Sequence, residues 1–238
     1  MERAPVVDRA ESFHSLEASS SGSVFNGVCL STSVSPARGG DWCETFVLSQ
    51  DVVALSIGDV CGHGAAAFPA MVATRQAVRD AAFRGLDPAL TLAAVNHFVC
   101  DLDPELQATA FFGLLNTRTG VLTFANAGHP APLIVGPGGS TFLSFPHPDV
   151  PLGVLRSRVP ALRVAFAPAQ TLLVLYTDGV IEHERQALRG ETQLRDAAMS
   201  AYGRATPPTA SSIEQLMSLA ATNEDDASIL ASWTPREE

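Results

Sequence analysis

The amino-acid sequence predicts an α+β domain in which helices pack outside mostly antiparallel β-sheet. Roughly nine short stretches have the apolar and β-branched composition of strands, and they follow one another through short turns instead of alternating strictly with helices. Two helical segments come together in the middle of the chain, and a third lies near the end. The chain has 238 residues, of which 46% are hydrophobic and 17% charged, so it suits one large domain with a buried core.

Strands are predicted where apolar residues run or alternate between clusters of turn residues. One of them, 171–176, is apolar on both faces, which indicates a central strand covered on each side. The complete set of predicted strands is 24–34, 45–48, 52–57, 109–115, 121–125, 131–135, 162–166, 171–176 and 227–233.

Three helices are predicted. The alanine-rich segment 65–83 has strong helix propensity. Asp87 followed by Pro88 marks the start of a second helix, because aspartate is a frequent N-cap and proline suits the first helical position. Apolar residues then recur at helical spacing as far as residue 102. The third predicted helix is 210–221.

Charge and composition limit the classes of partner and compartment. The net charge of −10 disfavours nucleic acid and anionic membranes as partners, because both select a basic face. The four cysteines have no paired C-x-x-C spacing, so neither a zinc site nor a thioredoxin-like motif is indicated. Residues 1–23 are polar and lack the apolar stretch of a signal peptide. We therefore expect a soluble cytoplasmic domain at 24–234, preceded by a flexible lead-in at 1–23, with no nucleic-acid or membrane partner.

Four short acidic motifs are the most informative local feature, and three of them lie where a predicted strand ends. Any one of them is explained by a turn, since Asp-Gly and Gly-Gly pairs often terminate strands. Four of them beside apolar β-like runs instead favour carboxylates that converge on a hard divalent cation such as Mg²⁺ or Mn²⁺. They are Gly39-Gly40-Asp41, Gly58-Asp59-Val60, Thr177-Asp178-Gly179 and Asp225-Asp226.

These motifs, with two more, occur in an order that resembles a known family. The ordered set is Arg38-Gly39-Gly40-Asp41-Trp42, Gly58-Asp59-Val60-Cys61-Gly62-His63-Gly64, Asn126-Ala127-Gly128-His129-Pro130, Pro151-Leu152-Gly153-Val154, Tyr176-Thr177-Asp178-Gly179 and Asp225-Asp226. It resembles the bacterial PP2C-like serine/threonine phosphatases of the sporulation-phosphatase type. That group includes general-stress regulators that act on anti-sigma-factor antagonists.

The resemblance implies a four-layer αββα sandwich with a binuclear Mg²⁺ or Mn²⁺ site at one end. It implies that Asp59 bridges both ions and that the backbone carbonyl of Val60 is a neighbouring ligand. Asp178 and Asp225 would complete the coordination of the first ion, and Asp41 would bind the second ion directly or through water. Of the pair at 225 and 226, the family pattern favours the first.

The expected reaction is hydrolysis of a phosphoserine or phosphothreonine ester by metal-activated water, without a covalent intermediate. Two divalent ions about 4 Å apart activate water and stabilise charge on the phosphoryl group. The sequence has no Gly-x-Ser-x-Gly elbow and no cysteine-based phosphate loop that would supply a nucleophilic side chain. His63 is the candidate general acid, with water or a helix-capping role as the alternatives. Arg38 is a candidate phosphate ligand or a solvated loop arginine.

Three residues in or near the motifs are not assigned to catalysis. Glu44 follows the first motif where the family usually has aspartate, which leaves its role at the metal site unsettled. His129 and Trp42 are expected to be structural. The family suggests a phosphorylated STAS-type substrate and regulation through the helix pair or by a partner protein.

Two alternatives to hydrolysis are compatible with parts of the sequence. One is a catalytically weak regulatory docking module with the same fold. The other is a nucleotide cyclase, suggested by Gly39-Gly40-Asp41 alone and opposed by Trp42 at the next position.

Overall fold

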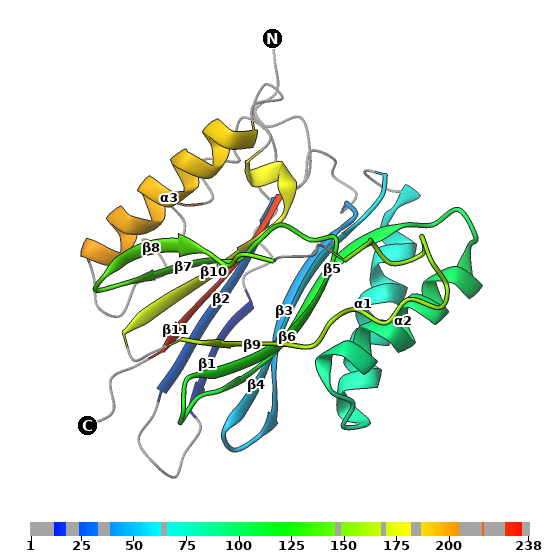
Figure 1. The fold of residues 1–238 in the computed structure, drawn as a ribbon, viewed down its shortest axis with the longest axis horizontal. Coiled ribbons are helices and arrows are strands. Elements are labelled where there is room, and N and C mark those ends of the chain that lie inside the picture. Colours follow the sequence, from blue (N-terminus) through cyan, green and yellow to red (C-terminus); the bar gives the residue numbers. More distant parts are fainter. Residues whose placement is uncertain are drawn as a thin grey trace.

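The computed structural model describes residues 12–17, 24–32, 39–62, 66–145, 149–167, 170–181, 187–204, 216 and 227–234. These residues form two antiparallel β-sheets packed face to face, with helices on both outer sides (Figure 1). The predicted α+β class and the αββα layering are confirmed.

The six-stranded sheet has the order β1-β2-β11-β10-β7-β8. Every neighbouring pair in it is antiparallel, and β10 lies between β11 and β7 as a central strand, as its two apolar faces predicted. Its strands are β1 (Ser12–Glu17), β2 (Val24–Thr32), β7 (Leu133–Gly136), β8 (Gly139–Phe142), β10 (Thr171–Tyr176) and β11 (Ala227–Thr234).

The five-stranded sheet has the order β3-β4-β5-β6-β9 and is also antiparallel throughout. Its strands are β3 (Asp41–Ser49), β4 (Val52–Val60), β5 (Ala108–Asn116), β6 (Val121–Ala127) and β9 (Arg163–Phe166).

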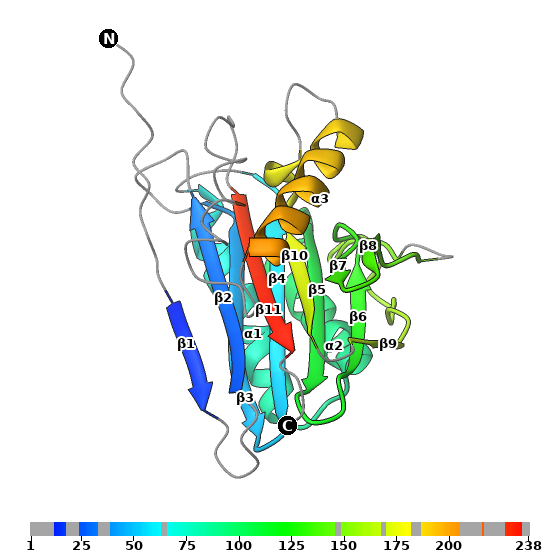
Figure 2. The same ribbon diagram turned by 90° about the vertical axis from the view of Figure 1, so that its left-hand side faces the viewer.

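Three helices complete the layers. Helices α1 (Phe68–Phe83) and α2 (Pro88–Leu102) cover the five-stranded sheet, and α3 (Ala187–Arg204) lies over the six-stranded sheet (Figures 1 and 2). The side chain of Asp87 accepts a hydrogen bond from the Leu90 amide at 2.9 Å, so the predicted N-cap of α2 is confirmed. No helix in the described part of the chain is both long and apolar enough to cross a membrane.

Strand periodicity distributes side chains between the layers. In β4, Leu55 and Ile57 point into the core between the two sheets, whereas Ala54 and Val60 pack under α1 and α2. In β10, Leu173 and Leu175 face the same inter-sheet core, and the intervening residues face α3. Because alternation continues past the last apolar residue, it also decides which way the polar residues at the strand ends point.

Some elements differ from the sequence prediction. Within the expected lead-in 1–23, Ser12–Glu17 forms β1 and pairs with β2. Strand β3 begins at Asp41, four residues earlier than expected, because the β3–β4 ladder continues as far as the pair Asp41–Asp59. Strand β8, with the sequence Gly-Ser-Thr-Phe, was missed because it has little β-like composition.

Helix α3 was also missed, because charged and polar residues are interspersed with its few large apolar ones. Its buried face is a narrow stripe formed by Leu194, Ala198 and Ala201. The helical spacing of these three residues is the feature of the sequence that could have predicted the helix. The predicted helix 210–221 lies outside the described residues except for Leu216, which is helical and buried.

Candidate metal centre

Asp41 and Asp59 are direct cross-strand neighbours at one end of the five-stranded sheet. Asp59 lies two residues beyond Ile57 on β4, so it continues the row of side chains that faces the inter-sheet core. Asp41 has the same orientation because residues paired across an antiparallel ladder point to the same face. The apolar core between the sheets therefore ends in a pair of carboxylates.

The third carboxylate comes from the other sheet. Strand β10 ends at Tyr176, and a 3₁₀ turn, Asp178–Val180, follows at once. The Thr177 hydroxyl donates a hydrogen bond to Asp41 Oδ2 at 2.7 Å, which joins the two sheets at this point. Asp178 Oδ1 accepts the Gly179 amide at 3.0 Å.

The charges of these acids act on one another. Burial raises the pKa of Asp41 well above its usual value, and the charges of Asp59 and Asp178 raise it further. Burial also raises the pKa of Cys61, again with contributions from Asp59 and Asp178. Clustered carboxylates that disfavour each other's ionisation are the environment that a divalent cation neutralises.

A cradle of oxygen atoms lies beside Gly40. A Cβ atom at this position would lie 2.4 Å from the Val60 carbonyl oxygen, 2.8 Å from Asp59 Oδ1 and 3.0 Å from the Gly62 carbonyl oxygen. Only glycine leaves room for this approach. Carboxylate and carbonyl oxygens are the donors that Mg²⁺ and Mn²⁺ prefer, so the donor set fits these ions.

The described residues contain part of the predicted site. Asp41, Asp59, Val60 and Asp178 come together at one end of the sandwich. Within the described ranges, no group of three or more His, Cys, Asp and Glu side chains is arranged closely enough to hold a metal. Arg38, His63 and the pair Asp225-Asp226 lie outside the described residues, so their predicted roles stay predictions.

Glu44 lies on the opposite face of β3 from Asp41. It is three residues further along the strand, and its side chain forms an ion pair with Arg79 of α1. The Arg79 guanidinium also lies 4.8 Å from the centre of the Phe46 ring. Glu44 therefore belongs to the sheet–helix contact and is absent from the carboxylate cluster.

Trp42 is a packing residue, as the sequence analysis expected. Its ring is buried against Gly58, where a Cβ would lie 2.1 Å from the ring, and its indole N–H donates to Ser56 Oγ at 2.9 Å. It helps to fix β3 against β4 directly beside the two carboxylates.

His129 is a buried imidazole behind the carboxylates. Its Nδ1 lies 3.0 Å from the hydroxyl of Thr109, the residue opposite Asp59 on β5. Asn126 fixes its backbone by bonding to both the His129 amide and carbonyl, each at 2.9 Å. Burial lowers the pKa of His129 to about 3, so the ring is neutral at physiological pH. These contacts agree with a structural role.

Sequence reasoning missed Thr177, which contacts Asp41, and Thr109, which is the cross-strand partner of Asp59. Thr177 immediately precedes Asp178 in the fifth motif, and this adjacency was the only local signal for it. Its partner Asp41 is 136 positions away in the sequence.

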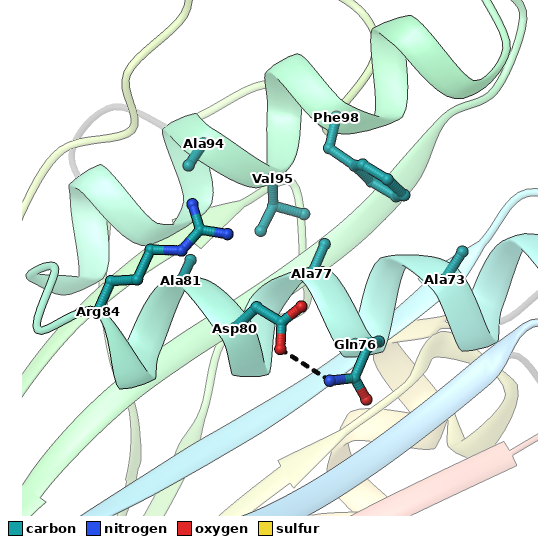
Figure 3. Close-up of a pocket in the computed structure, with 9 residues that line it drawn as sticks. All are labelled: Ala73, Gln76, Ala77, Asp80, Ala81, Arg84, Ala94, Val95 and Phe98. Atoms are coloured by element: carbon teal, nitrogen blue, oxygen red, sulfur yellow. Dashed lines mark hydrogen bonds between the residues drawn. The ribbon is translucent and has the colours of Figure 1, made fainter.

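A separate groove of about 490 Å³ runs between α1 and α2 (Figure 3). Small alanine side chains form much of its lining, with Phe98 and Arg84 among its larger residues. None of the site acids lines it. The groove is thus distinct from the carboxylate cluster.

Comparison with known proteins places the chain in a family. The model of the family stage II sporulation protein E (SpoIIE) matches residues 49–234. The chain belongs to the SpoIIE family. Members of this family are PP2C-type serine/threonine phosphatases, so the resemblance inferred from the six motifs is confirmed.

Solved structures of SpoIIE-family and other PP2C proteins have the same fold. The RsbU and RsbW domains of Rv1364c from Mycobacterium tuberculosis match with a TM-score of 0.74 and 26% identity, over 88% of this chain and 61% of that one. The PP2C domain of SpoIIE from Bacillus subtilis, with a fragment of its regulatory domain, gives 0.75 and 15%, over 88% and 63%. The catalytic domain of the phosphatase PstP with two manganese ions gives 0.66 and 16%, over 89% and 99%.

The chain spans about three fifths of the length of the first two of these structures. The likeness to SpoIIE and PstP, at 15% and 16% identity, establishes the fold.

Proposed function

We propose that this protein is a Mn²⁺- or Mg²⁺-dependent phosphatase that hydrolyses phosphoserine or phosphothreonine in a regulatory protein. The observation that carries the proposal is the meeting of Asp41, Asp59 and Asp178 at one end of a PP2C-type sandwich. Membership of the SpoIIE family supports the reaction class.

Each proposed ligand has a defined place in the chain. Asp59 would bridge two ions, with the Val60 carbonyl beside it, and Asp41 would serve the second ion. Asp178 and Asp225 would complete the coordination of the first ion. The two manganese ions in the PstP structure support a binuclear site. When bound, such ions lower the pKa of a water molecule and neutralise charge on the phosphoryl oxygens.

The protein's own residues contribute position and shape. Gly40 leaves space for the Val60 carbonyl and Asp59 Oδ1 to face the same point. Arg38 directly precedes the first Gly-Gly pair and is proposed to hold the phosphate, because its planar fork matches phosphate oxygens. His63, four residues after Asp59, is the proposed proton donor to the leaving serine, with water as the alternative.

The proposed substrate is a phosphorylated STAS-type protein in the cytoplasm, and a partner protein is proposed to regulate the activity. The similarity to a structure that contains RsbU and RsbW domains supports the proposal of a regulatory partner.

The test is dephosphorylation of a small phosphoester and of a phosphoserine STAS protein, in Mn²⁺ and in EDTA. Wild type is compared with Asp59→Ala and with Asp196→Ala, which removes an exposed carboxylate on α3. Activity that requires Mn²⁺, survives in Asp196→Ala and disappears in Asp59→Ala supports the proposal. A folded wild type that is silent on both substrates in excess Mn²⁺ overturns it in favour of a docking module.

A further inference from the structure

The hydroxyl of Thr177 lies where three strand ends meet. Thr177 is fully buried directly after β10, and it continues the β10–β11 ladder by donating its amide to the Ser228 carbonyl at 3.0 Å. The Ser228 amide donates back to Thr177 Oγ1 at 2.8 Å. On its other side Thr177 Oγ1 lies 2.7 Å from Asp41 Oδ2 at the start of β3.

The directions of these hydrogen bonds are fixed. An amide can only donate, so Thr177 Oγ1 is the acceptor toward Ser228. The single hydroxyl proton is then free to point at Asp41 Oδ2, which accepts it. The backbone of β11 thereby aims the proton of a residue in one sheet at a carboxylate in the other.

Each of the three strand ends carries a proposed ligand. Asp178 is the next residue after Thr177, Asp41 accepts its proton, and Ser228 lies three positions after Asp225. Displacement of this hydroxyl would therefore alter the position of Asp41 relative to Asp178. Hydrogen-bond partners behind metal ligands typically change affinity or activity by about 10- to 100-fold when they are removed.

We propose that Thr177 is a positioning residue of the metal centre, whose hydroxyl sets the placement of Asp41 across the gap between the two sheets. This inference rests on the proposed function, because it assumes that Asp41 and Asp178 serve one metal centre. Thr177 itself does not contact substrate in this proposal.

The chain offers a matched set of variants. Thr177→Val keeps the branched shape and removes the hydroxyl, whereas Thr177→Ser keeps the hydroxyl and removes the methyl group. Thr171→Val is the control: Thr171 is buried at the other end of β10, and its hydroxyl has no hydrogen-bond partner in the described part of the chain. The measurement is the Mn²⁺ dissociation constant, from the electron paramagnetic resonance signal of free Mn²⁺, with thermal unfolding as the check on folding.

We expect Mn²⁺ binding to weaken about tenfold or more in Thr177→Val and to stay within about threefold of wild type in Thr177→Ser and Thr171→Val. Activity of Thr177→Val should recover as Mn²⁺ is raised, which a merely structural defect would not show. In an Asp41→Asn background, Thr177→Val should add little, because its partner is already altered.

Wild-type affinity in Thr177→Val overturns the inference and leaves the proposed function intact. Equal weakening in Thr171→Val overturns it as well. Thr177→Ala is used if Thr177→Val does not fold, and failure of both to fold assigns Thr177 to stability alone. A wild-type protein that binds no Mn²⁺ overturns both proposals. A wild-type protein that binds Mn²⁺ but hydrolyses neither substrate overturns the proposed function only. In that case the Mn²⁺ affinities of the variants still decide the role of Thr177.

Discussion

Asp41 and Asp59 face one another across the β3–β4 ladder, on the side of the sheet that borders the inter-sheet core. Like charges in direct cross-strand opposition are unfavourable. Here burial and the charge of Asp59 both raise the pKa of Asp41 well above its usual value. This end of the sandwich is therefore electrostatically unfavourable until a proton or a cation neutralises it.

Replacing Asp59 with asparagine should stabilise the metal-free protein while removing metal-dependent turnover. The amide keeps the size of the side chain but removes the charge opposite Asp41, which should raise the free energy of unfolding in EDTA by about 1 kcal/mol. Turnover should fall by more than the roughly hundredfold typical of losing an outer-shell partner. Urea unfolding and Mn²⁺-dependent hydrolysis, with Asp196→Asn as the neutral control, measure the two effects. An Asp59→Asn protein that is less stable than wild type in EDTA would contradict the repulsion.

The stabilisation that Mn²⁺ provides should grow with pH. The folded-state pKa of Asp41 is raised, so its protonated form contributes stability below the usual value of 3.8, and this stability is lost as pH rises through the folded-state pKa. Metal binding needs the ionised carboxylate and therefore competes with the proton. The difference in melting temperature between Mn²⁺ and EDTA should increase between about pH 5 and about pH 8 in wild type. In Asp41→Asn the same difference in melting temperature should change little with pH. A difference that is also independent of pH in wild type would refute competition between Mn²⁺ and the proton at Asp41.

Local patterns in the sequence predicted the elements that carry the site. Strand β10 was identifiable because both of its faces are apolar, and α2 because Asp87 and Pro88 mark its start. The acidic motifs were identifiable because glycine and aspartate follow or precede apolar strands. These signals depend on neighbours within a few residues, which is the range over which composition and periodicity act.

The contacts between the sheets could not be predicted in this way. The bond from Thr177 to Asp41 depends on how two sheets pack, and no local pattern encodes it. The face of Glu44 depends on where β3 begins: once the strand starts at Asp41, a spacing of three residues puts Glu44 on the other side. Because the predicted strand began at residue 45, this alternation was not available from the sequence.

Gly40→Ala should damage the site, and Gly138→Ala should not. A Cβ at Gly40 would lie 2.4 Å from the Val60 carbonyl oxygen and 2.8 Å from Asp59 Oδ1, so two proposed ligands must move. No described atom lies within 4 Å of a Cβ built at Gly138. We expect Gly40→Ala to lose about 1–3 kcal/mol of unfolding free energy, and to bind Mn²⁺ at least about tenfold more weakly. Calorimetric titration of both variants tests this, and unaltered binding in Gly40→Ala would show that the cradle is not part of the metal centre.

Breaking the pair between Glu44 and Arg79 should leave metal binding unchanged. The two side chains are 24% and 37% exposed and lie on the helix side of the sheet, so the pair is worth at most about 1 kcal/mol. Glu44→Gln should therefore lower stability slightly and keep the wild-type Mn²⁺ dissociation constant. Arg79→Gln should also keep the wild-type Mn²⁺ dissociation constant, but it should cost more stability because it removes the contact with the Phe46 ring as well. A Mn²⁺ affinity reduced tenfold in Glu44→Gln alone would restore Glu44 to the metal site.

His129 should make the protein sensitive to acid. Burial lowers its pKa from 6.5 to about 3, so the unfolded chain takes up a proton first as pH falls. The stability contributed by the neutral imidazole is fully present above the unfolded pKa and is lost as pH falls from there toward the folded value. The loss should approach about 1.4 kcal/mol per pH unit for one proton.

The measurement is urea unfolding in EDTA at about pH 7, 6 and 5 for wild type and His129→Gln. The glutamine variant should be less stable throughout, because the contact with Thr109 is altered, but its stability should fall less steeply with acid. The contribution of Asp41 has the opposite sign and is shared by both proteins, so it cancels in the difference between them. Parallel curves would mean that His129 takes up a proton in the folded protein as readily as in the unfolded chain. The ring could not then be the buried neutral group that contacts Thr109.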